Sequence, residues 1–324
     1  MKIFFWTIAV LFLMGSSCEE ADPTSVMIYT GISGSRAEYL QQQLNEQFPD
    51  YMITLQVLST NTLTAQLQAE KTRTDADIIL GLETGLLESV QDFLADLSSF
   101  DVPEFLPELV PASKRFLPWD RSSGTIAINR ARLESDGLPI PYFYRDLLHP
   151  VYRGLVAMPN PTTSRTGYLF LVSLINAWSE DAAFEYFDRL AENNLQWTVS
   201  DTSPINSLIK DEAAIGLGMT VTAVNAINNH GAFLDLLYFA EGAPYVTTGF
   251  GIIKGKEKRP IVREVFTFIM TTLISKDKEL FSPEPVLINQ VSSISNYPLN
   301  IPYAHMDGVY DQTLKERLLE RWNH

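Results

Sequence analysis

Residues 155–178 read LVAMPNPTTSRTGYLFLVSLINAW, and this stretch says most about the fold. The run 155–158 is short and apolar, as in a buried strand, and a long apolar helix is expected over 168–178. A turn of small and polar residues lies between them. Strands that pass through polar turns into helices predict an α/β protein with a mainly parallel sheet and helices on both of its faces.

The same alternation precedes this stretch. Strands are expected at 26–29, 53–58 and 76–80, and helices at 63–70 and over 86–97. Ala37, Leu40, Leu44 and Phe48 recur at nearly every fourth position and predict a further helix. A Pro-rich stretch over 103–119 interrupts the pattern.

The alternation resumes after this interruption. Strands are expected at 124–129, near 214–216, at 236–239 and at 248–253. Helices are expected after Ser179, over 262–274, and at the end of the chain around Leu314, Leu318 and Trp322.

Length and charge limit the classes of protein. The 324 residues exceed what one compact core usually holds, which favours two lobes. The net charge of −15 argues against a nucleic-acid partner, because phosphate backbones are bound by clustered Lys and Arg. It leaves room for a small anionic ligand, since a few aimed donors suffice to hold one.

The first residues are typical of an export signal. Lys2 is followed by an apolar run over 3–14 and then by Gly15, Ser16, Ser17 and Cys18. We expect a signal peptide over 1–17, lipidation of Cys18 and a polar tether over 18–25. Gly15 stands where such lipid-attachment signals usually carry Leu, so plain secretion is the alternative. The lipoprotein reading places the chain in the periplasm or at the cell surface, anchored to the membrane.

Cys18 is the sole cysteine, so no internal disulfide and no cysteine-based metal site is expected. The four histidines lack the spacing of a helical metal motif. We therefore expect neither a bound metal nor a cofactor.

Several short motifs occur together in one order. They are YTG at 29–31, ADII at 76–79, GLPIP at 137–141 with YRDLL at 144–148 and YRG at 152–154, MPNP at 158–161 with SRTGY at 164–168, AIG at 214–216, and EGAP at 241–244. On these motifs the chain resembles the extracellular solute-binding proteins of ABC importers, in the branch of ferric-iron, aminoethylphosphonate, thiamine and sugar-phosphate receptors.

The resemblance implies a type II periplasmic-binding-protein fold: two α/β lobes, a hinge and a ligand cleft between them. Lobe 1 is expected over 25–118 and 246–288, and lobe 2 over 119–245 and 289–324. The implied function is to capture a small ligand, such as a phosphonate, a sugar phosphate or another small anion, and to deliver it to a membrane permease. The implied protein is a monomer and not an enzyme.

Hydroxyl-rich turns before helices supply the candidate ligand-binding residues, because the first amides of a helix lack internal partners and attract anions. Thr163, Ser164, Arg165 and Thr166 form one turn, in which Arg165 adds a charged donor. Thr30, Ser33 and Ser35 form a second turn. Glu83 follows a strand at the expected cleft edge, and Ser203 and Thr220 are expected near the cleft floor. For each turn, simple helix capping is the alternative.

Three alternatives stay open. Ferric receptors of this branch carry adjacent tyrosines after the segment matching 214–216, and residues 217–222 here contain none. Ferric iron or a ferric complex is therefore the third choice of ligand, after a phosphorylated or phosphonate compound and after another small organic anion or a sugar. A ligand sensor for a membrane receptor would use the same closure of the lobes. A hydrolase is the weakest reading, because the S-x-x-K pattern at 207–210 lacks its usual partner motifs.

Overall fold

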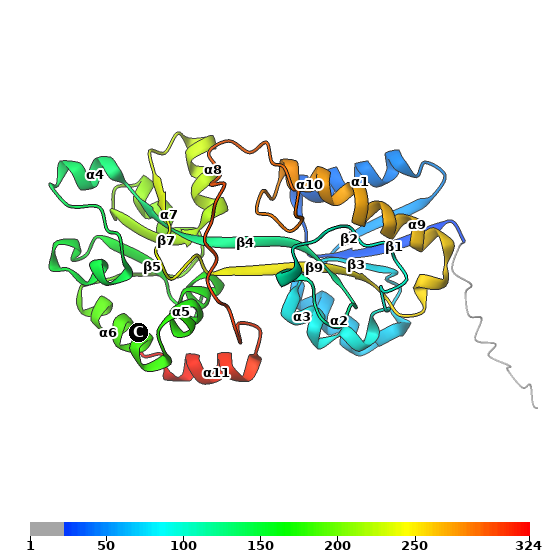
Figure 1. Cartoon of the computed structure of the whole chain (residues 1–324), viewed down its shortest axis with the longest axis horizontal. Helices are drawn as coiled ribbons and strands as arrows, with labels where there is room; N and C mark the ends of the chain where they lie inside the picture. Colours follow the sequence, from blue (N-terminus) through cyan, green and yellow to red (C-terminus); the bar gives the residue numbers. More distant parts are fainter. Residues whose placement is uncertain (1–22) are drawn as a thin grey trace, which may run out of the picture.

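The computed structural model describes residues 23–324, so the predicted signal peptide and Cys18 lie outside the described residues. Within 23–324, nine strands form one sheet in the order β2-β1-β3-β9-β4-β7-β5-β6, with β8 also paired to β4. Figure 1 shows two α/β parts, one at each end of the molecule, with β4 and β9 running between them. The predicted α/β fold class is confirmed.

One part, which we call lobe 1, is built on the first strands. These are β1 (Ser25–Thr30), β2 (Met52–Val57) and β3 (Ile78–Glu83). Both β2 and β3 pair with β1 in parallel, as strands joined through helices do. The helices of this lobe are α1 (Gly34–Gln47), α2 (Thr60–Glu70), α3 (Thr84–Ser89), α9 (Pro260–Phe268) and α10 (Ile274–Leu280).

The other part, lobe 2, repeats the design. Its strands are β5 (Val156–Pro159), β6 (Gln196–Thr198), β7 (Ile215–Met219) and β8 (Asp235–Leu237). Strand β5 pairs in parallel with β6 and β7. The helices are α4 (Arg130–Ser135), α5 (Arg165–Ala177), α6 (Glu180–Glu192), α7 (Ser203–Ile209), α8 (Thr220–His230) and α11 (Gln312–Arg321).

Two long antiparallel strands connect the lobes. Strand β4 (Leu117–Ile128) pairs with β9 (Tyr245–Ile252) through Ser123 and with β7 from Gly124 onward. The change of partner between these two neighbouring residues marks where β4 leaves one lobe and enters the other. The lobe boundaries that the sequence suggests remain a prediction.

Each lobe has its own apolar core. In lobe 1 the cluster around Ile28 and Ile78 packs against Val265 and Leu273 of the later helices. In lobe 2 the cluster around Met158 and Ile215 packs against Phe170 and Leu318. Two separate cores are expected of a chain this long, and they allow the lobes to move as units.

A third connection follows α10. Val286 lies in the core of lobe 1, whereas Ala304 lies in the core of lobe 2, so the chain crosses between them. Glu284 is buried at the start of this segment. Its carboxylate accepts hydrogen bonds from the Ser123 N–H at 2.8 Å, from the Tyr297 hydroxyl at 2.7 Å and from the Tyr303 hydroxyl at 3.1 Å. Burial raises the pKa of Glu284, although these hydrogen bonds oppose the shift.

Two elements differ from the sequence prediction. The helix expected over 86–97 ends as α3 at Ser89, because Leu94 instead forms a β-bridge with Ile253 and the Ala95 N–H binds the Ile252 carbonyl. Strand β4 begins at Leu117, inside the stretch expected to be irregular, because its pairing with β9 extends that far.

No helix among residues 23–324 has both the length and the hydropathy of a membrane-spanning segment.

Candidate ligand-binding site

A cavity of about 240 Å³ lies where the two lobes meet. Lobe 1 contributes Glu83 at the end of β3, and β9 contributes Val246. The start of α5 and the C-terminal segment supply most of the remaining wall, namely Pro161, Thr162, Thr163, Ser164, Arg165, Tyr168, Leu169, Val309, Lys315 and Leu319. Four of the predicted site residues therefore line one cavity: Glu83, Thr163, Ser164 and Arg165.

An ion pair joins the two lobes in this cavity. The Arg165 guanidinium lies 3.0 Å from the Glu83 carboxylate, and both side chains are partly exposed. Glu83 is at the carboxyl end of a parallel strand and Arg165 is the first residue of a helix that follows another, the positions where α/β folds place ligand sites. Each charge has a partner that a ligand of the right sign is able to replace.

The helix start that was expected to receive an anion already holds one from the chain itself. The Asp201 carboxylate accepts from the Ser164 hydroxyl and, at 3.1 Å, from the Thr166 N–H. The Ser164 hydroxyl oxygen in turn accepts from the Gly167 N–H at 3.2 Å. Partial burial raises the pKa of Asp201, but these hydrogen bonds and the charge of Arg165 outweigh it, so the pKa lies below its usual value.

The other predicted residues lie outside the cavity lining. Thr30 is buried, and its hydroxyl accepts from the Ile32 N–H at 3.0 Å, which shapes the turn after β1. Ser33 and Ser35 are exposed at the start of α1, where Ser33 makes no capping hydrogen bond through its side chain. These residues belong to a second strand-to-helix turn that the structure does not bring to the Glu83–Arg165 pair.

Ser203 and Thr220 take part in other hydrogen bonds. The Ser203 hydroxyl pairs with that of Ser200 at 2.6 Å. Thr220 is fully buried, and its hydroxyl lies 3.0 Å from the Ser123 hydroxyl and 3.2 Å from that of Tyr238. Thr220 thus belongs to the polar group around Glu284, at the point where β4 changes lobes.

The sequence analysis did not predict that the C-terminal segment contributes to the cavity and its surroundings. Tyr310 packs against Gly85 of α3, where an added Cβ would come within 2.6 Å of the Tyr310 Cβ, and its hydroxyl binds the Thr247 N–H. Lys315 and Leu319 of α11 reach the cavity itself. No local motif marks these residues, since what places them is the packing of α11 on α5 and α6 (Figure 1).

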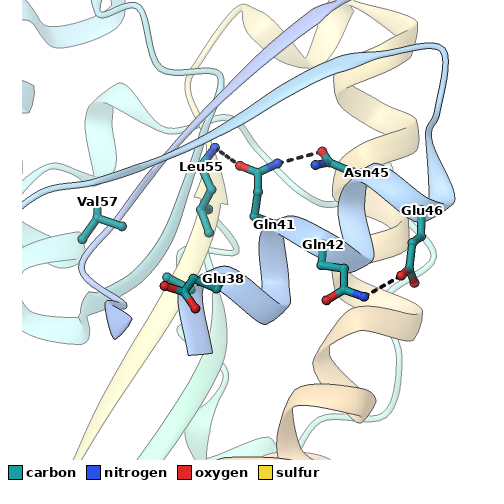
Figure 2. Close-up of a pocket in the computed structure, with 8 residues that line it drawn as sticks. Glu38, Gln41, Gln42, Asn45, Glu46, Leu55 and Val57 are labelled. Atoms are coloured by element: carbon teal, nitrogen blue, oxygen red, sulfur yellow. Dashed lines mark hydrogen bonds between the residues drawn. The ribbon is translucent and has the colours of Figure 1, made fainter. Parts of the chain in front are cut away.

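Two further hollows have a different character. One of about 220 Å³, also between the lobes, is lined by Glu88, Glu108 and Asp307 among others. A broader hollow of about 630 Å³ lies on the outer face of lobe 1 between α1 and β2, and Figure 2 shows its amide and carboxylate lining. None of the predicted site residues lines either of these hollows.

Within residues 23–324, no group of three or more His, Cys, Asp or Glu side chains is placed to hold a metal ion.

Comparison with protein families identifies the chain. Residues 82–278 match the model of the bacterial extracellular solute-binding proteins. The chain belongs to this family. The match begins at the end of β3 and contains β4, β9 and α5 in full, so it includes Glu83 and Arg165. The members bind solutes and are not enzymes, which confirms the expectation that this chain is not an enzyme.

Solved structures share the fold at low sequence identity. The periplasmic binding protein AfuA of Actinobacillus pleuropneumoniae, solved with fructose 6-phosphate, superposes with a TM-score of 0.68 at 20% identity, covering 92% of this chain and 97% of that one. Iron-bound HitA of Pseudomonas aeruginosa gives 0.74 at 15% identity, covering 92% and 99%. Apo ferric ion-binding protein A of Pasteurella haemolytica gives 0.75 at 12% identity, covering 92% and 97%. These likenesses confirm the two-lobed periplasmic-binding-protein fold.

A curated relative covers less of the chain. An uncharacterised protein of Haemophilus influenzae is 32% identical over 129 residues, which are 40% of this chain and 37% of that protein. The chain thus spans little more than a third of the length of this relative.

Proposed function

We propose that this protein is the substrate-binding component of an ABC importer and that it captures a small anionic ligand between its lobes. The observation that carries the proposal is the Glu83–Arg165 ion pair, which faces a cavity shared by both lobes. An anion that binds Arg165 replaces Glu83 as its partner. Charge-assisted contacts of this kind are about twice as strong as neutral hydrogen bonds and suit phosphate or carboxylate groups.

The size of the cavity favours a small ligand. At about 240 Å³ it lies just under the range of roughly 300–1,000 Å³ typical of sites for drug-sized molecules. The AfuA structure with fructose 6-phosphate adds support for a phosphorylated compound, since that protein shares the fold. A phosphonate, a sugar phosphate or another small anion is therefore our first choice. Ferric iron ranks last, because residues 217–222 lack the adjacent tyrosines that ferric receptors of this branch carry.

Delivery would depend on closure of the lobes. A ligand shifts the balance between open and closed forms only by the difference in its affinity for them. A ligand in this cavity has such a difference when its contacts extend to both lobes, because both lobes contribute to the cavity wall. The closed form would then dock on the membrane permease.

A thermal-shift screen of the purified protein tests this proposal. Phosphonates, sugar phosphates, carboxylates, neutral sugars and ferric citrate are the probes. A ligand present at a hundredfold excess over its Kd stabilises the folded protein by about 2.7 kcal/mol. We expect a rise in Tm with a phosphorylated or phosphonate compound, and a smaller radius of gyration by small-angle X-ray scattering with the same compound. A response to ferric citrate alone would contradict the proposed ligand class.

The membrane anchor is tested separately. We propose that Cys18 carries a lipid that holds the protein at the membrane, in the periplasm or at the cell surface. In cells, the protein is expected in the membrane fraction, and Cys18→Ser is expected to release it into the soluble fraction. Equal release of both forms would favour plain secretion.

A further inference from the structure

One buried polar group in the cavity wall has no partner. Tyr168 is 2% exposed, and its hydroxyl makes no hydrogen bond to any residue within 23–324. A buried hydroxyl without a partner is costly and therefore uncommon in folded proteins. Burial raises the pKa of Tyr168 to about 12, with Asp311 adding to the shift, so the hydroxyl keeps its proton and can donate it. Tyr168 lines the same cavity as Glu83 and Arg165.

A cation lies over the ring of this tyrosine. Lys315 lines the cavity, and its ammonium group lies 5.2 Å from the centre of the Tyr168 ring. No ion pair or side-chain hydrogen bond connects Lys315 to another residue in the described chain. The helix that carries it is held firmly, because Arg317 and Arg321 of α11 both bind Glu180 of α6 at 2.7–2.8 Å. These ion pairs hold the helix segment that carries Lys315 against α6.

Two of the first amides of α5 already have partners in the chain itself: the Thr166 N–H binds the Asp201 carboxylate, and the Gly167 N–H binds the Ser164 hydroxyl. Side chains are therefore the main donors left for a ligand anion in this cavity. Arg165, Lys315 and Tyr168 supply two positive charges and a hydroxyl donor, and Glu83 is the acid that faces them. Two cations match a doubly charged group better than a single carboxylate.

We propose that Tyr168 and Lys315, together with Arg165, bind the doubly charged end of a phosphate monoester or phosphonate, and that Glu83 is an internal counter-ion which this group displaces. The inference rests on the proposed function and assigns ligand contacts to the C-terminal helix. The Glu83–Arg165 pair joins the two lobes at this point. With ligand bound, the anionic group takes the place of the Glu83 carboxylate.

Calorimetric titration with inorganic phosphate, methylphosphonate and fructose 6-phosphate tests the cationic part. Lys315→Gln is expected to weaken binding about ten- to a hundredfold, as the loss of a hydrogen bond to a charged group does. Lys210→Gln is the matched control: it removes the same charge from an exposed position of the same lobe, outside the cavity, and should leave the affinity unchanged. The three probes distinguish free phosphate, a phosphonate and a phosphate ester as the source of the group.

Tyr168→Phe separates a ligand contact from a structural role. Its hydroxyl makes no hydrogen bond within residues 23–324, so the variant should keep its Tm while binding the same probe about tenfold more weakly. A lower Tm with unchanged affinity would show a structural role only and would overturn this part of the inference.

Glu83→Gln tests the counter-ion. Removing the competing carboxylate should strengthen binding of the anionic probe several-fold. Glu88 lies in α3 and lines the neighbouring cavity. Glu88→Gln is therefore the control and should leave the affinity for the probe unchanged. Weaker binding by Glu83→Gln would mean that Glu83 contacts the ligand instead of competing with it.

Two outcomes separate this inference from the proposed function. If the wild-type protein binds a probe and compacts, but Lys315→Gln and Tyr168→Phe bind as tightly as wild type, the inference is overturned and the function stands. If none of the three probes binds at millimolar concentration while a neutral sugar does, both the inference and the proposed ligand class fail, although solute binding itself remains.

Discussion

At the scale of single residues, the start of α5 shows how one side chain changes the role of its neighbours. Ser164 caps the helix by accepting from Gly167, and it also donates to Asp201. The helix dipole, which attracts anions, is thereby satisfied from within the chain. Arg165, one residue further on, points to the cavity and pairs with Glu83. Neighbouring residues of one polar motif thus serve structure and binding separately.

We predict that Ser164→Ala lowers the free energy of unfolding by about 1 kcal/mol, the usual cost of losing a helix cap. Denaturation in urea measures it. Thr163→Ala is the control, since Thr163 is exposed and its hydroxyl makes only a long 3.4 Å contact with the Asn160 carbonyl. Its effect should stay within about 0.5 kcal/mol. Equal costs for the two variants would contradict the capping role of Ser164.

At the scale of elements, β2 and α11 depend on contacts that secondary-structure patterns do not reveal. Strand β2 is at the edge of the sheet, where unpaired backbone groups invite another strand. Gln41 of α1 covers part of this edge: its side-chain oxygen accepts from the Leu55 N–H at 2.8 Å (Figure 2). Its side-chain nitrogen donates to the Ile53 carbonyl, also at 2.8 Å. It occupies backbone groups that a neighbouring strand would otherwise use.

We therefore predict that Gln41→Ala promotes self-association through β2. The apparent mass in size-exclusion chromatography should rise with protein concentration, whereas wild type should not change. Gln42→Ala is a close control, because the Gln42 side chain binds only Glu46 on the same helix. Concentration-independent behaviour of Gln41→Ala would mean that the side chain does not protect the edge.

The ion pairs that hold α11 against α6 should weaken at acidic pH. The hydrogen bond from Arg317 lowers the pKa of Glu180 to about 2, with partial burial opposing it and Arg321 adding to it. A lowered folded-state pKa stabilises the fold above the ordinary value of 4.5, and this contribution disappears as the pH falls toward 2.

Urea denaturation at several pH values across this range measures the effect. Wild type should lose more stability over the range than Glu180→Gln, which has no such charge to titrate. Glu185→Gln, on an exposed site of the same helix, should behave as wild type does. If Glu180→Gln kept the full pH dependence, another group would be responsible.

At the scale of the whole molecule, Glu284 links the connections between the lobes. It receives hydrogen bonds from Ser123 of β4 and from Tyr297 and Tyr303 of the third connection, and the Arg121 guanidinium lies 3.6 Å from the centre of the Tyr303 ring. The hinge strand and the last crossing segment are therefore joined through one buried carboxylate. Closure of the lobes has to preserve or rearrange this group.

We predict that Glu284→Ala destabilises the protein by at least about 2 kcal/mol, because the buried Ser123 N–H and two partly buried tyrosine hydroxyls lose their acceptor together. Urea denaturation again gives the measure. Glu279→Ala, an exposed acid of α10, serves as control and should cost less than about 0.5 kcal/mol. A small effect for Glu284→Ala would imply that water replaces the carboxylate.

Much of the fold was predictable from local patterns. The strand-to-helix alternation identified the α/β class and most of the strands, because apolar periodicity records which face of each element is buried. Glu83 and Arg165 were also within reach, since parallel strands place their carboxyl ends at one edge and polar residues there are candidates for binding. The extent of β4 and the end of α3 were not predictable, because pairing with β9 decides both.

By itself, then, the sequence determined the fold class, the family and one of the polar turns of the site, the turn at 163–166. Only the tertiary structure decided that Asp201 occupies the start of α5, that Glu83 and Arg165 pair across the lobes, and that Lys315 and Tyr168 meet at the same cavity. The pattern of apolar and polar residues in a segment indicates which face of that helix or strand is buried. The contacts named here join segments that are far apart in the chain, so no such pattern predicts them. Their geometry arises when α11 docks on lobe 2 and when the hinge strands set the two lobes face to face.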